Sequence, residues 1–293
     1  MDEPQAPRPL AVVTGASSGI GYHLAMLAAQ HGYDLVVAAD RPLDAAVADF
    51  RNAGAQQVHA VQAELASRQG VDALINTLQG REVDALMANA GHGLGGRFLD
   101  QDFTKVQHVI DTNVTGTIYL LQHVARGMVA RGRGRILVTG SVAGFQPGSF
   151  HAVYNGSKAF IDSFTQALRN EMKDTGVTVS LLMPGPTDTE FFERADLLDT
   201  RMGADMKKDD PAMVARVGFD AMLKGEADVV AGWRSRMQVL AAKVMPAQAV
   251  AQVHRKLAEP GSARHPERAE VHPIGASRGK SSKDSKDSTK GKR

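Results

Sequence analysis

One stretch of the chain, residues 136–158, combines residue types that could move a proton to or from a substrate. It reads ILVTGSVAGFQPGSFHAVYNGSK, in which an apolar start predicts a strand, the glycines after it predict a turn, and the residues that follow have helical spacing. Ser141 falls at the end of the predicted strand. Tyr154 and Lys158 lie one helical turn apart, so their side chains share one face of the helix.

This pairing has a chemical use. An ordinary tyrosine titrates near ~10 and is a poor general acid or base at neutral pH. The ammonium of Lys158 would favour the phenolate of Tyr154 and lower its pKa. Ser141 could then donate a hydrogen bond to a substrate carbonyl while Tyr154 gives or takes the proton. A tyrosine and a lysine at this spacing also occur by chance in roughly one such sequence in five or six, so the assignment needs independent support.

A glycine-rich turn near the N-terminus supplies that support. The apolar strand at residues 10–13 runs into Thr-Gly-Ala-Ser-Ser-Gly-Ile-Gly, and a helical pattern follows. Glycines allow the backbone to approach a ligand closely, and the N-terminus of the helix offers free N–H groups to a pyrophosphate. By itself such a turn can also be only a tight turn. The residues predicted to bind a cofactor here are Gly15, Ser17, Ser18, Gly19, Ile20 and Gly21.

The segments after this turn alternate between strands and helices. Apolar runs at residues 35–39, 58–61 and 83–87 predict strands, and helical patterns separate them. This alternation predicts a parallel, Rossmann-like doubly wound α/β sheet with ligands at the C-terminal ends of its strands. Asp40 closes the second strand, close to the ~20 residues past the glycine turn at which a ribose-binding acid is expected, and Arg41 follows it.

The second half of the chain continues the pattern. We expect a long helix over residues 103–131 that contains Asn113, and a helix from Tyr154 to residue 173. A strand at 177–183 follows, with a helix at 211–223 and a last strand at 228–231. An apolar helical segment at 237–257, broken at Pro246, fits core, partner interface or lid support better than a membrane anchor.

Length and composition limit the function classes. The chain has 293 residues, of which 43% are hydrophobic, and this suits one α/β domain, expected over residues 1–258. A net charge of +2 gives no case for nucleic acid as a partner. The absence of cysteine excludes a disulfide framework, a thiolate metal site and a cysteine nucleophile, and we predict no metal.

The two ends of the sequence carry less information. The N-terminal residues lack the basic patch and apolar core of a secretory signal, and no apolar run reaches the length of a membrane span. We therefore predict a cytoplasmic protein with no membrane partner. Residues 259–293 are rich in Lys, Ser, Gly and Asp, and this composition predicts a disordered basic tail.

With these motifs in this order, the sequence resembles the short-chain dehydrogenase/reductase family across roughly residues 9 to 235. The resemblance implies that Tyr154 exchanges the proton, Lys158 lowers its pKa and holds the ribose, Ser141 orients the carbonyl, and Asn113 keeps a water in a proton relay. It also makes residues 191–210 the substrate lid. Further residues that the resemblance places against the cofactor are Glu64, Leu65, Asn89, Ala90, Gly91, Pro184, Gly185, Thr187 and Thr189.

Three residues depart from the family pattern. Ala88 replaces the first asparagine of the Asn-Asn-Ala-Gly motif, Glu64 replaces the usual aspartate near the adenine, and Thr187 replaces the usual valine after Pro-Gly. Cofactor binding remains plausible because the main chain, Asn89 and Leu65 can still shape the pocket.

The sequence therefore predicts an NAD(P)-dependent oxidoreductase that moves a hydride between a nicotinamide cofactor and a small alcohol or carbonyl substrate. The resemblance also implies a homodimer or homotetramer, paired through the helices at 103–131 and 154–173. One alternative is a non-catalytic dinucleotide-binding redox sensor or scaffold, against which the full set of catalytic residues argues. A second is an epimerase or dehydratase of the extended relatives, which tend to carry a different glycine turn.

The choice between NAD and NADP depends on the side chain that meets the adenosine ribose. The carboxylate of Asp40 can accept a hydrogen bond from the 2′-hydroxyl and would repel a 2′-phosphate. In an alternative alignment Ala39 takes that place, and Arg41 turns inward to bind a phosphate. Ser17 and Ser18 stand where many NADP-binding relatives have a basic residue. The sequence therefore leans slightly toward NAD.

Overall fold

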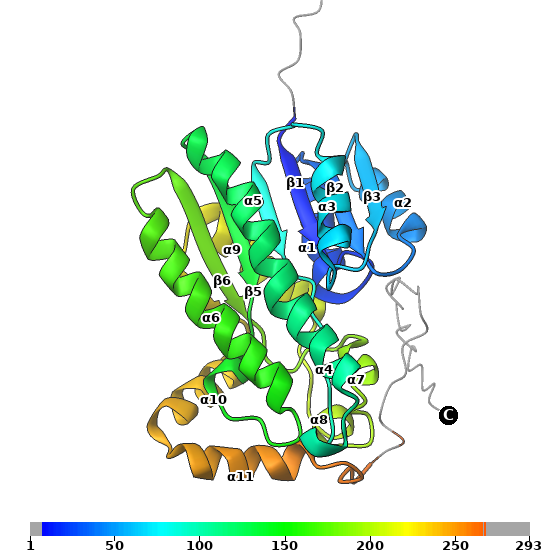
Figure 1. Ribbon diagram of the computed structural model, residues 1–293, viewed down its shortest axis with the longest axis vertical. Helices are drawn as coiled ribbons and strands as arrows, with labels where there is room; N and C mark the ends of the chain where they lie inside the picture. The colour runs from blue at the N-terminus through cyan, green and yellow to red at the C-terminus, as the bar shows by residue number, and fades with distance from the viewer. Residues whose placement is uncertain (1–7, 266, 268–293) are drawn as a thin grey trace, which may run out of the picture.

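The computed structural model describes residues 8–265 and residue 267. Within this part, a seven-stranded parallel sheet has the order β3-β2-β1-β4-β5-β6-β7. The predicted doubly wound α/β fold is confirmed (Figure 1). The strands are β1 Leu10–Thr14, β2 Asp34–Ala39, β3 Val58–Gln62, β4 Ala85–Ala88, β5 Gly134–Thr139, β6 Val177–Met183 and β7 Asp228–Val230.

Helices cover both faces of the sheet, and this explains why the strands are apolar on both sides. In β1, Leu10 and Val12 face one core, to which α3 (Arg68–Thr77), α5 (Thr117–Ala130) and α6 (Ala152–Met172) contribute. Ala11 and Val13 face the other core, to which α1 (Gly19–Gln30), α2 (Asp44–Asn52) and α9 (Pro211–Lys224) contribute. Successive side chains of a strand point to opposite faces, so one short run serves two cores.

The strand order reverses at β1, which pairs with β2 on one side and β4 on the other. The helices that follow these strands leave on opposite faces, so a crevice opens beyond the C-terminal ends of β1 and β4. Dinucleotides bind at this point in open α/β sheets. The fold therefore places the glycine turn and the segment after β4 at the same edge.

The long helix predicted over residues 103–131 is interrupted. It consists of α4 (Phe103–Ile110), a π-helical turn η2 (Asp111–Gly116) and α5. Gly116 packs so closely on the segment after β3 that a Cβ at this position would lie 2.0 Å from the carbonyl oxygen of Leu65. The wider turn accommodates this contact and contains Asn113. Such π-bulges occur often at functional sites.

The helices of the lid and of the C-terminal segment lie over the C-terminal end of the sheet (Figure 1). The predicted lid contains two short helices, α7 (Phe191–Arg194) and α8 (Arg201–Ala204). The predicted segment 237–257 forms α10 (Trp233–Val244) and α11 (Ala247–Ala258), separated at Pro246 as expected. The remaining short helices are η1 (Phe98–Asp100) and η3 (Val142–Phe145).

The start of the predicted tail makes ordered contacts with the lid. The backbone N–H of Gly261 donates to the carboxylate of Asp199 at 2.8 Å, and those of Arg264 and His265 donate to Asp205 at 3.0 and 3.1 Å. These bonds extend the packed part of the chain past the predicted boundary at residue 259. The rest of the predicted tail lies outside the described residues.

Within residues 8–265, no helix is both long and apolar enough to cross a bilayer. The cytoplasmic location stays a prediction.

Candidate active site

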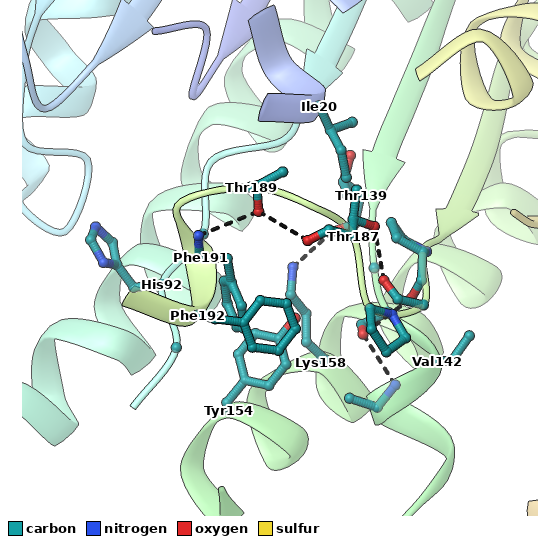
Figure 2. A pocket seen from close by; sticks show the side chains of 18 of the residues that line it. Ile20, His92, Thr139, Val142, Tyr154, Lys158, Thr187, Thr189, Phe191 and Phe192 are labelled. Atoms are coloured by element: carbon teal, nitrogen blue, oxygen red, sulfur yellow. Dashed lines mark hydrogen bonds between the residues drawn. The ribbon is translucent and has the colours of Figure 1, made fainter. Parts of the chain in front are cut away.

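Ser141, Tyr154 and Lys158 meet at the C-terminal end of β5. Ser141 caps η3, where its Oγ accepts a hydrogen bond from the backbone N–H of Ala143 at 3.1 Å. Tyr154 and Lys158 stand one turn apart in the first part of α6. The Lys158 Nζ donates to the carbonyl oxygen of Thr139 at 2.8 Å, and Figure 2 shows its side chain between Thr139 and Tyr154. The structure therefore brings together the three residues that sequence spacing singled out.

Aromatic rings enclose the phenol of Tyr154. His151 stacks on it with ring centroids 4.5 Å apart and an interplanar angle of 18°, and Phe191 of the lid approaches it with centroids 5.0 Å apart (Figure 2). Burial raises the pKa of Tyr154 to about 12, and the hydrogen bond with Ser141 opposes this only in part. The expected lowering of this pKa by Lys158 is not found, because the ammonium binds the Thr139 carbonyl and lies 5.9 Å from the ring centroid.

A buried carboxylate that the sequence analysis did not single out lies beneath these residues. Asp162 stands one turn beyond Lys158 on α6, and its Oδ1 accepts a hydrogen bond from the backbone N–H of Ser141 at 3.3 Å. Gly140 and Gly144 make room for it, since a Cβ there would lie 1.8 and 2.3 Å from its carboxylate oxygens. The signal in the sequence was the four-residue spacing, which runs on from Tyr154 through Lys158 to Asp162.

Burial and charge act on Lys158 and Asp162 in opposite directions. Burial lowers the pKa of Lys158, and the negative charge of Asp162 partly restores it. Burial raises the pKa of Asp162, and Lys158 and the Ser141 N–H oppose the rise. Each charged form therefore depends on the other, which is the behaviour of a coupled pair in a low-dielectric site.

A cavity of about 400 Å³ opens in front of these side chains. It extends from the glycine turn, past the ends of the central strands, to the lid. Of the residues predicted to bind the cofactor or take part in catalysis, three do not line it: Gly21, Arg41 and Asn113. Those that line it are Gly15, Ser17, Ser18, Gly19, Ile20, Asp40, Glu64, Leu65, Asn89, Ala90, Gly91, Ser141, Tyr154, Lys158, Pro184, Gly185, Thr187 and Thr189.

The glycine turn has the geometry that a pyrophosphate site requires. Gly15 and Gly19 adopt φ of +68° and +57°, in the left-handed region that other residues rarely enter. Gly21 acts in packing, since a Cβ there would lie 2.1 Å from the carbonyl oxygen of Gly15. The first turn of α1 has no acidic residue of its own, and the carboxylate of Glu190, which accepts from the Ser18 hydroxyl at 3.4 Å, is paired with Arg41. These residues fit a dinucleotide.

The two charged residues after β2 have different orientations. The carboxylate of Asp40 lines the cavity and pairs with Arg194 of α7, and the His92 Nε2 lies 3.5 Å from it. His92, with Arg194 beside it, holds the pKa of Asp40 well below its usual range. Arg41 turns instead toward Glu190, with which it forms an ion pair. These ion pairs connect the end of β2 to the lid and to Glu190, the residue before it.

Asn113 and Asn89 hold the loops that form the cavity wall. The Asn113 Oδ1 accepts from the backbone N–H of His92 at 2.7 Å, and its Nδ2 donates to the His92 carbonyl and to the Ser157 Oγ, both at 2.9 Å. The Asn89 Nδ2 donates to the carbonyl oxygen of Thr14 at 3.2 Å. Asn113 therefore holds the segment after β4 from behind the cavity, and no direct contact with the cavity is present.

The segment after β6 closes the cavity above Lys158 (Figure 2). Within it, the Thr187 Oγ1 donates to the carbonyl oxygen of Gly185 at 2.9 Å. The Thr189 Oγ1 accepts from the backbone N–H of Phe191 at 3.3 Å. Gly185 allows α10 to approach, because a Cβ there would lie 2.0 Å from the Ser235 Oγ.

This arrangement agrees with a comparison against known protein families. The model of the family described as short chain dehydrogenase matches residues 9–197. The chain belongs to the short-chain dehydrogenase family.

Relatives and solved structures support this membership over most of the chain. An uncharacterized oxidoreductase of Myxococcus xanthus is 32% identical over 244 residues, which cover 80% of this chain and 92% of the relative. A short-chain dehydrogenase from Sphingobium yanoikuyae in complex with NADPH has a TM-score of 0.72 at 29% identity, and covers 80% of this chain and 93% of that chain. A short-chain dehydrogenase/reductase from Burkholderia phymatum in complex with NAD has a TM-score of 0.70 at 25% identity, and covers 79% and 92%.

As a short-chain dehydrogenase, the protein is an NAD(P)-dependent oxidoreductase that acts on a small molecule with a nicotinamide cofactor. The predicted family and enzyme class are confirmed. None of these findings favours the non-catalytic sensor or scaffold.

The end of the cavity beyond Tyr154 is mainly apolar, as the site of an apolar substrate would be. It lies between the lid and the two C-terminal helices, and its polar groups include His151 and His254. The Nδ1 of His254 lies 2.9 Å from the carbonyl oxygen of Ser149. The large apolar side chains that line this end are Phe191, Phe192, Met202, Met206, Met245, Val250, Val253 and Leu257.

Proposed function

We propose that this short-chain dehydrogenase interconverts an apolar alcohol and the corresponding carbonyl compound, with Tyr154 as the residue that exchanges the proton. The observation that carries the proposal is the position of Ser141, Tyr154 and Lys158 on one wall of a cavity whose other end fits a dinucleotide. The apolar lining around Phe191 and α11 supports an apolar substrate.

Each side chain has a separate role in the reduction of a carbonyl. When bound, the nicotinamide would supply the hydride that reaches the carbonyl carbon. The phenol of Tyr154 donates its proton to the carbonyl oxygen, and the raised pKa keeps that proton in place at neutral pH. The hydroxyl of Ser141 donates a second hydrogen bond to this oxygen. Lys158 would hold the nicotinamide ribose.

Asp162 is proposed as a positioning residue that acts through its neighbours. Its carboxylate accepts the backbone N–H of Ser141 and lies one turn from Lys158. The hydrogen bond fixes the start of the segment that carries the Ser141 hydroxyl. The charge keeps Lys158 protonated despite its burial. We propose likewise that Asn113 is a positioning residue, because it holds the loop after β4. The proton relay that the family resemblance implies would place a water at this loop.

The replacement of Tyr154 by phenylalanine tests the central assignment. Tyr154→Phe removes the transferable proton and leaves the ring, so turnover should fall at least about a hundredfold while cofactor affinity changes little. Tyr119→Phe is the matched control. Tyr119 lies on α5, its hydroxyl donates to Asp72 of α3 at 2.6 Å, and neither residue lines the cavity. Turnover should be followed as nicotinamide absorbance, and cofactor affinity by fluorescence. A Tyr154→Phe enzyme with more than a few per cent of wild-type kcat would contradict the proposal.

We propose NAD(H) as the preferred cofactor, because Asp40 lines the cavity, whereas Arg41 does not line it and is paired with Glu190. A carboxylate at this place accepts a ribose hydroxyl and repels a 2′-phosphate. The wild-type kcat/KM should be higher with NAD(H), and Asp40→Ala should narrow the difference. A wild-type preference of about tenfold or more for NADP(H), about 1.4 kcal/mol in the other direction, would contradict the assignment.

A homodimer or homotetramer is proposed as the working form. The large apolar side chains exposed on α4 and α6, Phe103, Ile110 and Phe160, support it. These helices pack together and offer one surface to a second copy.

A further inference from the structure

Helix α10 has a row of large apolar side chains that face away from the protein. Trp233, Met237, Leu240 and Val244 are exposed by 71%, 57%, 58% and 82%. Their spacings of four, three and four residues place them along one line of the helix. We call these four residues the α10 stripe. Within residues 8–265 the fold does not bury them, so the α10 stripe is available to a partner.

Two arginines flank the α10 stripe, and the sequence around it is basic. Trp233 to Ala258, the two C-terminal helices and their link, contains Arg234, Arg236, Lys243, Arg255 and Lys256 and no aspartate or glutamate. On a helix of 3.6 residues per turn, Arg234 and Arg236 fall on opposite sides of the α10 stripe. The guanidinium of Arg234 lies 5.7 Å from the centre of the Trp233 ring, so the tryptophan has an apolar body beside a cation.

The rest of α10 faces the substrate end of the cavity. On α10, Gln238, Ala241 and Ala242 line that cavity, whereas Ser235 and Val239 are buried against the body of the protein. One helix thus separates the apolar cavity from the exposed α10 stripe. Figure 1 shows α10 and α11 together across the lower end of the molecule, as drawn.

We propose that the α10 stripe docks on an anionic phospholipid surface, with α10 lying in the plane of the interface. Apolar residues in a row with flanking arginines and a tryptophan have the composition of interfacial amphipathic helices. The sequence analysis favoured core, partner interface or lid support for this segment. The exposures of the α10 stripe exclude core for these four side chains, and docking on lipid departs from the prediction of no membrane partner.

Charge also decides against a second copy of this chain as the occupant. A two-fold interface would set the same patch against itself and bring the arginines and lysines of two copies together. Within α10 and α11 no acidic residue is present, and Glu259, which follows α11, already pairs with Arg255. An anionic lipid surface supplies the opposite charge over the whole patch, at about 1 kcal/mol for each basic residue near it.

Trp233 provides the measurement, because it is the sole tryptophan of the chain. Vesicles of phosphatidylcholine with about one third phosphatidylserine should shift its emission to shorter wavelength and carry the full-length protein into the pellet on sedimentation. Vesicles of phosphatidylcholine alone should bind it more weakly. The docking does not depend on the catalytic assignment, so turnover on a water-soluble carbonyl compound provides the independent check of folding.

Two sets of variants separate the apolar and the charged parts of the surface. The double variant Met237→Ser and Leu240→Ser should weaken vesicle binding at least about tenfold and leave turnover on the soluble compound unchanged. Arg234→Glu with Lys256→Glu should remove the preference for anionic vesicles. Val129→Ser on α5 is the matched control, since Val129 is also an exposed apolar residue but lies outside the α10 stripe; it should leave binding unchanged.

Three results would overturn the proposal. The first is wild-type protein that stays in the supernatant with an unshifted Trp233 emission at a large excess of anionic vesicles. The second is equal binding to neutral and anionic vesicles. The third is a fall in molar mass by light scattering, without vesicles, in the Met237→Ser and Leu240→Ser variant, because a second copy would then be the occupant.

Discussion

At the residue scale, Tyr154, the proposed proton donor, lies in a different electrostatic setting from the one that its neighbours in sequence suggest. Four-residue spacing places Lys158 near the phenol of Tyr154, but burial dominates and raises the pKa of Tyr154 to about 12. The protein therefore holds the tyrosine as an acid at neutral pH. Lys158 is then the residue of the proposed catalytic set whose charge changes as the pH rises. Asp162 favours its protonated form.

The pH profile of Asp162→Asn tests this role. Burial lowers the pKa of Lys158, so wild-type kcat/KM for carbonyl reduction should fall on the alkaline side below the ordinary lysine range near ~10.4. Asp162 stabilises the charged lysine, and its loss should lower that pKa further and move the alkaline fall to lower pH by roughly one unit. The measurement is kcat/KM against pH at saturating cofactor.

Two further variants keep this test interpretable. Asp220→Asn, at an exposed position on α9, should leave the profile unchanged. Asp162→Glu retains the charge and should retain the wild-type alkaline fall if it folds. An Asp162→Asn profile that is lower in height but unmoved in pH would show that Asp162 has a structural role alone.

At the scale of elements, the lid connects both ends of the cavity. Its first helix, α7, pairs Arg194 with Asp40 at the cofactor end and brings Phe191 against Tyr154 at the substrate end. The second, α8, is held by the chain that follows α11, through hydrogen bonds to Asp199 and Asp205. Contacts far apart in sequence thus decide where the lid lies.

Truncation measures the contribution of these contacts. A chain that ends at Glu259 loses the backbone donors to Asp199 and Asp205. Its melting temperature should fall by about 2–4 °C. Its KM for the substrate should rise, because Met202 and Met206 of the same lid segment line the cavity. A chain that ends at Glu267 keeps those donors and should match the full-length protein in both quantities. Equal melting temperatures and KM values for the two truncations would show that the contacts contribute nothing.

At the scale of the whole molecule, two of the exposed apolar surfaces in the described part of the chain have proposed partners. Phe103, Ile110 and Phe160 lie exposed on α4 and α6, and the α10 stripe lies on α10. We expect the first surface to bind a second copy and the second to bind lipid. The two surfaces make the protein a candidate for an oligomer that presents several α10 stripes at once, which would strengthen weak docking by avidity.

Light scattering tests the first of these surfaces. The wild-type protein should have the molar mass of a dimer or tetramer at micromolar concentration. Phe160→Glu introduces a charge into the proposed interface and should lower that mass toward the monomer. Leu240→Glu, in the α10 stripe, should leave it unchanged. A monomeric wild-type protein at micromolar concentration and above would refute the proposed oligomer.

The sequence by itself determined those features that depend on neighbours along the chain. The alternation of apolar strands and helices predicted the doubly wound sheet, because the period of apolar residues is a local property of each element. The same locality placed Tyr154 and Lys158 on one face of a helix. The glycine turn was likewise readable, since the positive φ of Gly15 and Gly19 has a cost for any other residue.

Only the tertiary structure decided the features that depend on contacts between distant segments. Gly140 and Gly144 form a notch around Asp162 because the segment after β5 packs on α6. The packing of the lid likewise decides that Asp40, and not Arg41, lines the cavity. Burial by the same packing raises the pKa of Tyr154. The spacing of residues along the sequence cannot predict this rise, because it does not tell how far water is excluded from a side chain. The exposure of the α10 stripe was hidden in the sequence for the same reason, because an apolar row on a helix looks alike whether it faces a core or the solvent.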